Sequence, residues 1–248
     1  MTLSLGMLRV VDLAVEVDGI RVVKRASLEI RRGEVILLLG PNASGKSSLL
    51  NAIAGLPRFK IVRGDVILDG DSIKDLEPSE RVKLGIALAV QHPPKLRGIK
   101  VRRLLEKLIA GREGSIIEVR REIERISKVL DIGELLDRDY GAGFSGGEIK
   151  RVEVATLLAL RPRIALVDEP DSGVDVDSVL LIASALDLMI EQGTEAILLV
   201  THSGFIARHV KHDRAYVMLD GKVVAEGSST RILNLVLERG FAAVKRWG

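Results

Sequence analysis

The 248-residue chain contains no cysteine. Disulfide bridges, thiolate metal ligands and a cysteine nucleophile are therefore excluded, and a reducing, cytoplasmic setting is expected. Aromatic residues make up only 3% of the chain, too few for a surface that stacks bases. The 37 basic and 34 acidic side chains nearly cancel, and no block of like charge stands out although the sequence pI is about 9.2. Nucleic acid is therefore not an expected partner.

Long apolar runs are also missing. The apolar runs at 35–39, 179–186 and 196–200 are far shorter than the roughly 18 residues that a membrane-spanning helix needs. The N-terminal residues do not follow the basic-then-apolar pattern of a secretory signal. Direct insertion into a membrane is therefore not expected. With 47% hydrophobic and 29% charged residues, the chain has the composition of a globular protein with a sizeable core.

Apolar segments of strand length alternate with helical segments along most of the chain. Apolar strands are expected at 34–40, 86–90, 163–168 and 196–202, and the clearest helix at 176–193. This alternation predicts an α/β core with a mixed, mainly parallel sheet whose strands are buried on both faces. The first thirty residues instead alternate β-branched and polar residues, which predicts an antiparallel hairpin that turns at Asp18-Gly19.

Residues 93–143 form a different kind of segment. Their periodicity is helical, with no apolar strand between the helices, so we predict an all-helical insert. The α/β core then comprises residues 1–92 and 144–248. The charges of the insert fit a solvated face with pairs at i and i+4. The tail that begins at Ser229 is expected to contain one helix.

A glycine-rich turn, GPNASGKS at 40–47, directly follows the first apolar strand and precedes a helix. This is the P-loop pattern, in which Gly40 and Gly45 let the backbone wrap a phosphate group and the helix adds the positive end of its dipole. Lys46 is expected to bridge the β- and γ-phosphates, and the Ser47 hydroxyl to ligate Mg²⁺. The residues predicted to bind phosphate are Gly40, Pro41, Asn42, Ala43, Ser44, Gly45, Lys46, Ser47 and Ser48.

Two acidic residues stand at the end of the apolar strand 163–168. Asp168 is expected to hold Mg²⁺ through a water molecule, and Glu169 to face the γ-phosphate and orient the attacking water. After a P-loop, such a pair indicates a nucleotide hydrolysis site. His202 ends another strand at the same edge of the sheet. A purely structural histidine is the alternative, but its place beside the site favours a γ-phosphate contact that also steadies Glu169.

Gln91 ends the strand 86–90 at the entrance to the insert. A side-chain amide there can reach both the Mg²⁺ shell and a molecule docked on the insert, so Gln91 is a candidate metal ligand and nucleotide sensor. His209 and His212 are three residues apart on an expected helix. Because a third metal ligand is missing, we interpret them as surface residues.

A second glycine-rich turn, FSGGE at 144–148, also precedes a helix. Together with the P-loop, Gln91, ALVDEP, DSGVD and His202, it occurs in the order and approximate spacing of an ABC-type ATPase cassette, which the chain resembles over nearly its whole length. The resemblance implies ATP and Mg²⁺ as cofactors, ATP hydrolysis as the reaction and the fold of a P-loop NTPase.

The resemblance also implies a head-to-tail dimer of the protein with itself or a homologue, with two ATP molecules at the interface. Ser145, Gly146 and Gly147 would bind the ATP that is held by the P-loop of the other subunit. Asp175 would run along the dimer interface and couple the two sites.

Two features depart from the usual ABC pattern. The second turn has Phe144 and Glu148 where Leu and Gln are usual. ABC cassettes commonly place an adenine-stacking aromatic residue in the first hairpin, whereas the matching position here is Val17 or close to it, and no aromatic residue precedes Phe59. Adenine is therefore expected to be held by apolar contacts, with loose base selectivity.

Several segments resemble the SufC ATPase of the Suf iron–sulfur assembly system. They are VQHPPKLRGIKV at 90–101, FSGGEIKR at 144–151, DEPDSGVDVDS at 168–178 and LNLVLERGFAAV at 233–244. The resemblance implies a SufB or SufB–SufD scaffold as partner, bound around residues 91–99. The lack of cysteine fits, because the cluster would sit on the scaffold. Pro170, where many SufC chains have Ser or Thr, and the divergent insert are departures.

Two other interpretations use the same core motifs. The nucleotide-binding subunit of an ABC membrane transporter would receive a permease loop on the same surface, but the DSGVDVD and QHPPKLRG contexts favour the Suf interpretation. A soluble ABC protein of DNA repair or translation needs two cassettes in one chain or a long coiled coil, and the sequence contains neither.

Overall fold

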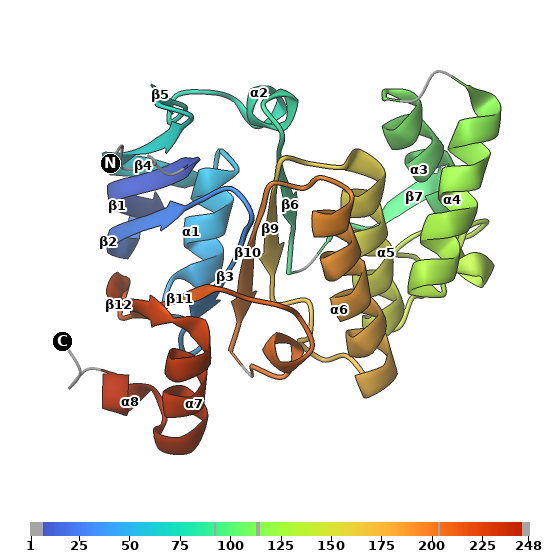
Figure 1. Ribbon diagram of the computed structural model, residues 1–248. Coiled ribbons are helices and arrows are strands. Elements are labelled where there is room, and N and C mark those ends of the chain that lie inside the picture. The colour runs from blue at the N-terminus through green and yellow to red at the C-terminus, as the bar shows by residue number, and fades with distance from the viewer. Residues whose placement is uncertain (1–6, 92, 113–114, 203, 245–248) are drawn as a thin grey trace.

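One large twisted sheet runs through the molecule, and helices pack on both of its faces (Figure 1). The computed structural model describes residues 7–91, 93–112, 115–202 and 204–244. In pairing order, the strands are β5 (Asp71–Ser72), β4 (Phe59–Leu68), β1 (Leu8–Val17), β2 (Ile20–Ile30), β12 (Lys222–Ser228), β11 (Arg214–Leu219), β3 (Glu34–Leu39), β10 (Ala196–Thr201), β9 (Ile164–Asp168) and β6 (Ile86–Ala89). The helices are α1 (Lys46–Ile53), α2 (Pro78–Lys83), α3 (Val101–Ala110), α4 (Ile116–Leu130), α5 (Gly146–Leu160), α6 (Val176–Glu191), α7 (Ser229–Arg239) and α8 (Phe241–Val244).

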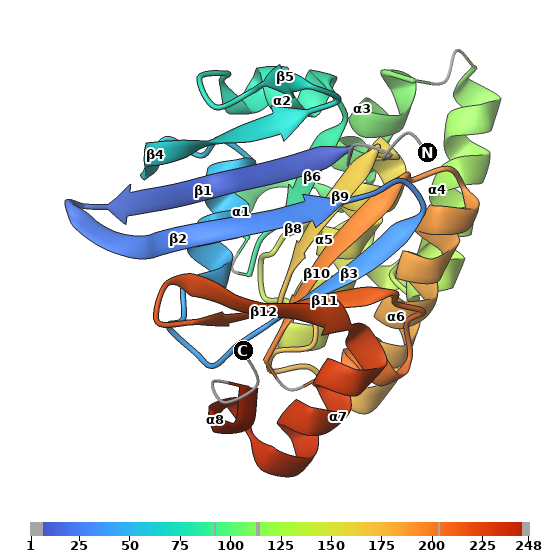
Figure 2. The ribbon, with the colours of Figure 1, turned by 60° about the vertical axis from the view of Figure 1, so that its left-hand side comes forward.

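The sheet has a parallel and an antiparallel part. β11, β3, β10, β9 and β6 pair in parallel, as the apolar strands of the sequence predict. β1 pairs antiparallel with β2 and β4, and the β1–β2 hairpin projects from one side (Figure 2). Its turn falls at Asp18-Gly19, where both residues have positive φ, 51° and 81°, so the predicted hairpin is confirmed.

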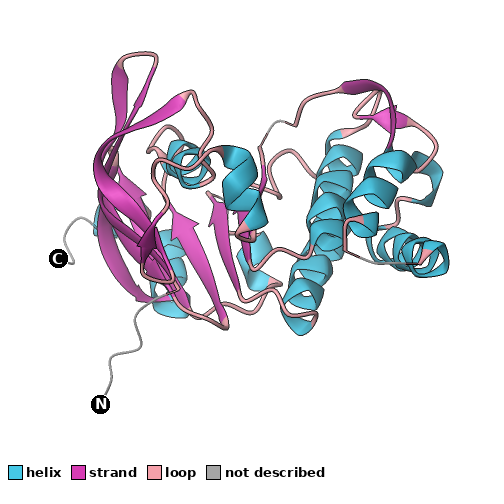
Figure 3. Cartoon of the chain, turned by 90° about the horizontal axis from the view of Figure 1, so that it is seen from above, coloured by secondary structure: helices cyan, strands magenta, loops and turns pink. Residues whose placement is uncertain are grey.

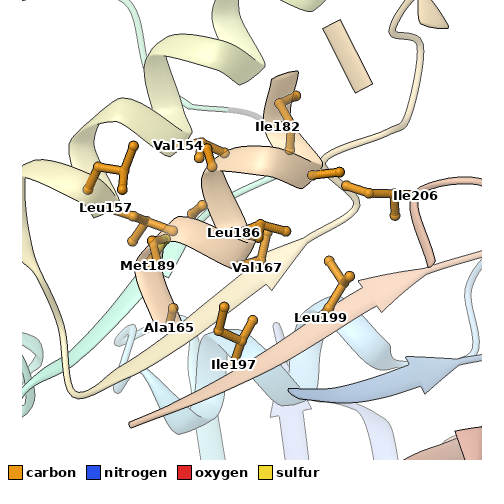
Figure 4. Packing of buried hydrophobic residues seen from close by; sticks show 14 of the residues in the cluster. Val154, Leu157, Ala165, Val167, Ile182, Leu186, Met189, Ile197, Leu199 and Ile206 are labelled. Atoms are coloured by element: carbon orange, nitrogen blue, oxygen red, sulfur yellow. The ribbon is translucent and has the colours of Figure 1, made fainter. Parts of the chain in front are cut away.

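Each parallel strand contributes to two hydrophobic cores. Along β3, Ile36 and Leu38 face one core, which contains α1 and the antiparallel strands, while Leu37 and Leu39 face the other. This follows from the alternation of side chains along a strand. In the second core, α5 and α6 lie over β9 and β10, with Leu186 and Met189 of α6 among the packed side chains (Figure 4). The strands that lead to the candidate site are therefore fixed by packing on both faces of the sheet.

The insert differs from its prediction in one respect. Its helices α3 and α4 lie at the end of the molecule opposite the antiparallel strands (Figure 3). However, the insert is not all helical, because β7 (Leu96–Lys100) and β8 (Asp139–Tyr140) pair near its two ends. β7 is mostly exposed and β8 has only two residues, so neither has the apolar pattern by which a strand is recognised. The helix α5 packs against both α3 and α4 and therefore joins the insert to the core.

The segment around His209 also differs from its prediction. A 3-10 turn at Ile206–Arg208 ends just before it, so His209 and His212 do not share a helix. His209 is exposed, whereas the Nδ1 atom of His212 lies 2.7 Å from the Ser229 hydroxyl. Among the described residues, no three His, Asp or Glu side chains gather into a metal-binding group. In the same ranges, no helix is both long and apolar enough to cross a membrane.

A buried arginine caps the helix that follows the P-loop. Arg81 of α2 is only 2% exposed. Its guanidinium donates to the carbonyl oxygens of Ala52 (2.9 Å) and Ile53 (2.8 Å) at the end of α1, and to those of Lys74 (2.7 Å) and Leu76 (3.0 Å). Burial lowers the pKa of Arg81, against the attraction of nearby carboxylates. The cation is thus held by four backbone carbonyl oxygens, two of them at the end of α1, where helix carbonyls lack intrahelical donors.

Arg81→Leu is therefore expected to lower the free energy of unfolding by about 3 kcal/mol or more, because several buried carbonyl groups lose their donors. Urea denaturation followed by circular dichroism measures this. Lys83→Leu, at an exposed position of the same helix, is the matched control and should change stability by less than about 0.5 kcal/mol. Equal stability of the two variants would contradict the capping role.

Candidate functional site

The P-loop connects the end of β3 to α1, as the sequence predicts. Gly45 has φ 104°, and a Cβ atom there would lie 2.9 Å from Met218 Cε and 3.1 Å from the Val22 carbonyl oxygen. A Cβ atom on Gly40 would lie 2.3 Å from the Met218 carbonyl oxygen. Both glycines are therefore required by the close approach of neighbouring strands, and Gly45 also by its left-handed backbone.

Lys46 lies inside the loop and is buried. Its Nζ donates to the carbonyl oxygens of Gly40 (2.8 Å) and Pro41 (2.9 Å), and lies 3.6 Å from Glu169 Oε1. Burial lowers the pKa of Lys46, while the carboxylates of Glu169 and Asp168 act in the opposite direction. The loop thus surrounds a cation that can face phosphate oxygens.

Two of the three residues expected to hold Mg²⁺, Ser47 and Asp168, meet at the base of the loop. The Ser47 hydroxyl donates to Asp168 Oδ1 over 3.1 Å. Burial raises the pKa of Asp168, and the adjacent Glu169 carboxylate adds to this against the Ser47 hydrogen bond. A hydroxyl and a buried carboxylate side by side are oxygen donors of the kind that Mg²⁺ prefers, and a bound cation would favour the ionised acid. The donor set therefore fits magnesium.

Glu169 is the point where the catalytic candidates converge. Gln91 Nε2 donates to Glu169 Oε2 over 2.7 Å, and His202 Nδ1 lies 3.4 Å from the same oxygen. Glu169 is buried and has φ 47°, an unusual conformation for a residue with a side chain. Its backbone N–H donates to the Val200 carbonyl oxygen over 3.0 Å, which fixes it between β9 and β10. The structure thus places Gln91, Glu169 and His202 together.

Asp171 fixes the segment that carries His202, a contact that the sequence does not reveal. The Thr201 hydroxyl donates to Asp171 Oδ2 over 3.0 Å, and the Ile206 N–H lies 3.5 Å from the same oxygen. The carboxylate therefore binds the chain on both sides of His202. Asp171 thus joins two loops that are separated by thirty residues in the sequence.

A pocket of about 420 Å³ lies over the P-loop. It is lined by Val22, Asn42, Ala43, Ser44, Gly45, Lys46, Ser47, Ser48, Gln91, Glu169, Ser172 and His202. Gly40, Pro41 and Asp168 lie behind this lining, in contact with Lys46 and Ser47. Val22 of β2 is the residue of the first hairpin that lines the pocket. Ser172 also lines the pocket and was not predicted.

The second glycine turn does not line this pocket. Ser145 is the N-cap of α5 and exposed, and its hydroxyl accepts from the Glu148 N–H over 3.2 Å. In return Glu148 Oε2 accepts from the Ser145 N–H over 2.6 Å. Glu148 thus completes a reciprocal capping box, a role that glutamate and glutamine can both fill, so the departure from the usual pattern preserves the cap. The backbone hydrogen bond from Ser145 lowers the pKa of Glu148, which keeps the cap ionised.

The two glycines of this turn permit close packing against the DSGVD segment. A Cβ atom on Gly147 would lie 2.6 Å from Ser178 Oγ and 2.7 Å from Asp175 Oδ2. One on Gly146 would lie 2.7 Å from the Gly173 carbonyl oxygen. Asp175 itself caps α6, since its carboxylate accepts from the N–H (2.8 Å) and the hydroxyl (2.9 Å) of Ser178. The starts of α5 and α6 therefore form one unit, away from the P-loop pocket.

Gly147→Ala is expected to force the α5 and α6 starts apart, because the added methyl group overlaps Ser178 and Asp175. ATP binding by the monomer should stay within about threefold of wild type, since the P-loop is untouched, while the rate of ATP hydrolysis should fall about tenfold or more. Equilibrium binding and steady-state hydrolysis measure the two effects. Ala142→Gly is the control, because it removes one methyl group from the loop before the turn, outside the packed unit, and should leave both quantities near wild type.

The fold and the site define a P-loop protein that hydrolyses nucleotides. Residues 23–172 match the ABC transporter family. The curated relatives include Vegetative protein 296 of Bacillus subtilis (strain 168), 32% identical over 98% of this chain and 95% of the relative. They also include the probable ATP-dependent transporter ycf16 of Pyropia yezoensis, 35% identical over 92% and 94% of the two chains. The chain belongs to the ABC transporter family of ATP-binding cassettes.

Solved structures agree with this assignment. A dimeric ATP-binding cassette in a post-hydrolysis state, bound to ADP and Pi, is similar with a TM-score of 0.77 and 27% identity, over 90% of this chain and 98% of that one. A nucleotide-free cassette from an ABC transporter has a TM-score of 0.76 and 27% identity, over 96% and 98%. The P-loop ABC fold is therefore confirmed, and the protein is an ATPase that uses ATP with Mg²⁺.

Proposed function

We propose that ATP binds with its phosphates in the P-loop pocket and is hydrolysed by water positioned at Glu169. The observation that carries this proposal is the convergence of Lys46, Gln91 and His202 on the Glu169 carboxylate. Lys46 supplies positive charge to the phosphates, and His202 steadies Glu169 and contacts the γ-phosphate. Ser47 and Asp168, together with Gln91, would hold Mg²⁺, which when bound would neutralise phosphate charge.

We further propose that two copies close head to tail around two ATP molecules. The turn at Ser145, Gly146 and Gly147 lies outside its own pocket yet offers a helix N-terminus suited to phosphate. In a dimer, this turn would complete the pocket of the other subunit. Asp175, packed against Gly147, would lie along the interface and link the two sites. The dimeric post-hydrolysis cassette shows that a related protein adopts a dimer.

For the partner, we propose a SufB/SufD-like scaffold in the cytoplasm, on which ATP-driven closure promotes iron–sulfur cluster assembly. The segments at 90–101 and 168–178 support this proposal, as does the absence of cysteine from the motor itself. The scaffold would dock around Gln91 and the insert strand β7, whose Ile99 is 43% exposed. A transporter permease is the second candidate, because curated relatives include a probable ABC transporter ATP-binding protein of Streptococcus pyogenes.

Affinity purification of the tagged protein from its native cells tests the choice of partner. A soluble SufB-like protein is the expected companion, and Ile99→Glu should remove it. Val62→Glu, the same change at an equally exposed position (43%) on β4, should not. A multi-spanning protein that is recovered only with detergent would instead identify a transporter motor. Full recovery of the partner with Ile99→Glu would contradict the docking surface.

A further inference from the structure

The helix that follows the second glycine turn carries two buried charged side chains that have no part in the site described so far. Lys150 is 5% exposed and Glu153 is 6% exposed. They are three residues apart on α5, so they share one face of that helix. A buried charge is costly unless it is hydrogen-bonded. Both therefore need a structural or functional reason.

Both side chains form hydrogen bonds with the backbone of the segment that carries Gln91. Lys150 Nζ donates to the carbonyl oxygens of Gln91 (2.6 Å) and Val90 (3.4 Å). Glu153 Oε1 accepts from the Val90 N–H over 3.1 Å. The segment at the end of β6 is thus bound to α5 on both its donor and its acceptor sides. The Gln91 amide in turn donates to Glu169.

The second oxygen of Glu153 faces the insert. The hydroxyl of Tyr140, a buried residue of β8, donates to Glu153 Oε2. Tyr140 pairs with Leu96 of β7, the strand that carries Ile99. Burial raises the pKa of Glu153, and the bonds from Tyr140 and Val90 oppose this. One side chain on α5 therefore contacts the insert and the Gln91 segment together.

We propose that Lys150 and Glu153 are positioning residues for ATP hydrolysis, which set Gln91 against Glu169 and join that position to α5. Because α5 begins at the Ser145 turn, the Gln91 contact in one site is rigidly connected to the turn that completes the other. This inference rests on the ATP site proposed above. It adds a route by which the insert, through Tyr140, can alter hydrolysis.

Lys150→Met tests the inference in steady-state ATP hydrolysis by the full chain. We expect kcat to fall about tenfold while the KM for ATP stays within about twofold, because the pocket itself is unchanged. In a Gln91→Ala background, Lys150→Met should cause no further loss, since both changes remove the same positioning. A purely structural role would instead lower the melting temperature without lowering kcat, and no non-additivity with Gln91→Ala would arise.

Two further variants keep the test decisive. Tyr140→Phe removes one hydroxyl, so the protein should fold, and kcat should fall about threefold, again only when Gln91 is present. Glu122→Gln is the matched control, since Glu122 is a buried carboxylate on α4 whose hydrogen-bond partners are Arg125 (2.7 Å) and Arg161 (3.0 Å) rather than Gln91. It should lower the melting temperature and leave kcat unchanged.

The outcomes separate the inference from the proposed site. If Gln91→Ala slows hydrolysis but Lys150→Met and Tyr140→Phe do not, the positioning role is overturned and the site stands. If the losses of Lys150→Met and Gln91→Ala multiply, the two act independently and the inference fails. If Gln91→Ala itself hydrolyses ATP at the normal rate, the proposed role of Gln91 is wrong, and the inference is overturned with it.

Discussion

Lys46→Ala should abolish ATP binding. The Nζ atom of Lys46 is held inside the P-loop by the carbonyl oxygens of Gly40 and Pro41, 3.6 Å from Glu169. Alanine removes the only cation that lines the pocket among the described residues, and leaves the buried carboxylates of Glu169 and Asp168 near the phosphates. Loss of a charge-assisted contact and gain of repulsion together should weaken the Kd by at least about 100-fold. Isothermal titration with Mg·ATP measures this.

The control for this experiment is Lys60→Ala, at an exposed position of β4, which should leave the Kd unchanged. A thermal melt without nucleotide shows whether the Lys46→Ala protein remains folded. A folded Lys46→Ala protein that binds ATP within threefold of wild type would show that Lys46 does not contact the phosphates.

The P-loop and the acidic strand end could be predicted because their signals are local. The apolar strand, Gly40, Gly45 and Lys46 are contiguous in sequence, and an apolar strand that ends in Asp168 and Glu169 brings both acids to the edge of a parallel sheet. The meeting of Gln91, Glu169 and His202 follows from the same rule, since each ends a parallel strand.

The contacts that could not be predicted connect distant segments. Lys150 reaches Gln91 across 59 positions, and nothing in the local sequence aims a lysine on α5 at that backbone. The strand β8 has two residues, too few for periodicity. Val22 lines the pocket because β2 passes close to Gly45, and that path is a tertiary feature. The resemblance to ABC cassettes identified the second turn, but only packing shows why Gly147 must lack a side chain.

Glu169→Gln is expected to retain ATP binding and to slow hydrolysis by about 100-fold or more, the usual loss when a general base is removed. Glutamine keeps the volume of the buried side chain and an oxygen that can accept from Gln91 Nε2. It cannot take a proton from the attacking water. It also removes one negative charge from the vicinity of the γ-phosphate, which favours the ATP-bound state.

If closure is head to tail, slow hydrolysis should make the Glu169→Gln protein accumulate as a dimer in Mg·ATP, as light scattering after size exclusion would show. Adding Ser145→Arg tests the geometry, because the exposed N-cap of α5 would then place a bulky group where the phosphate of the other subunit must lie. That double variant should bind ATP as a monomer. A dimer that persists with Ser145→Arg would rule out contact of this turn with the second ATP. Among the described residues, Glu169 is the only carboxylate that lines this pocket. Normal hydrolysis by Glu169→Gln would therefore show that a group other than a pocket carboxylate positions the water.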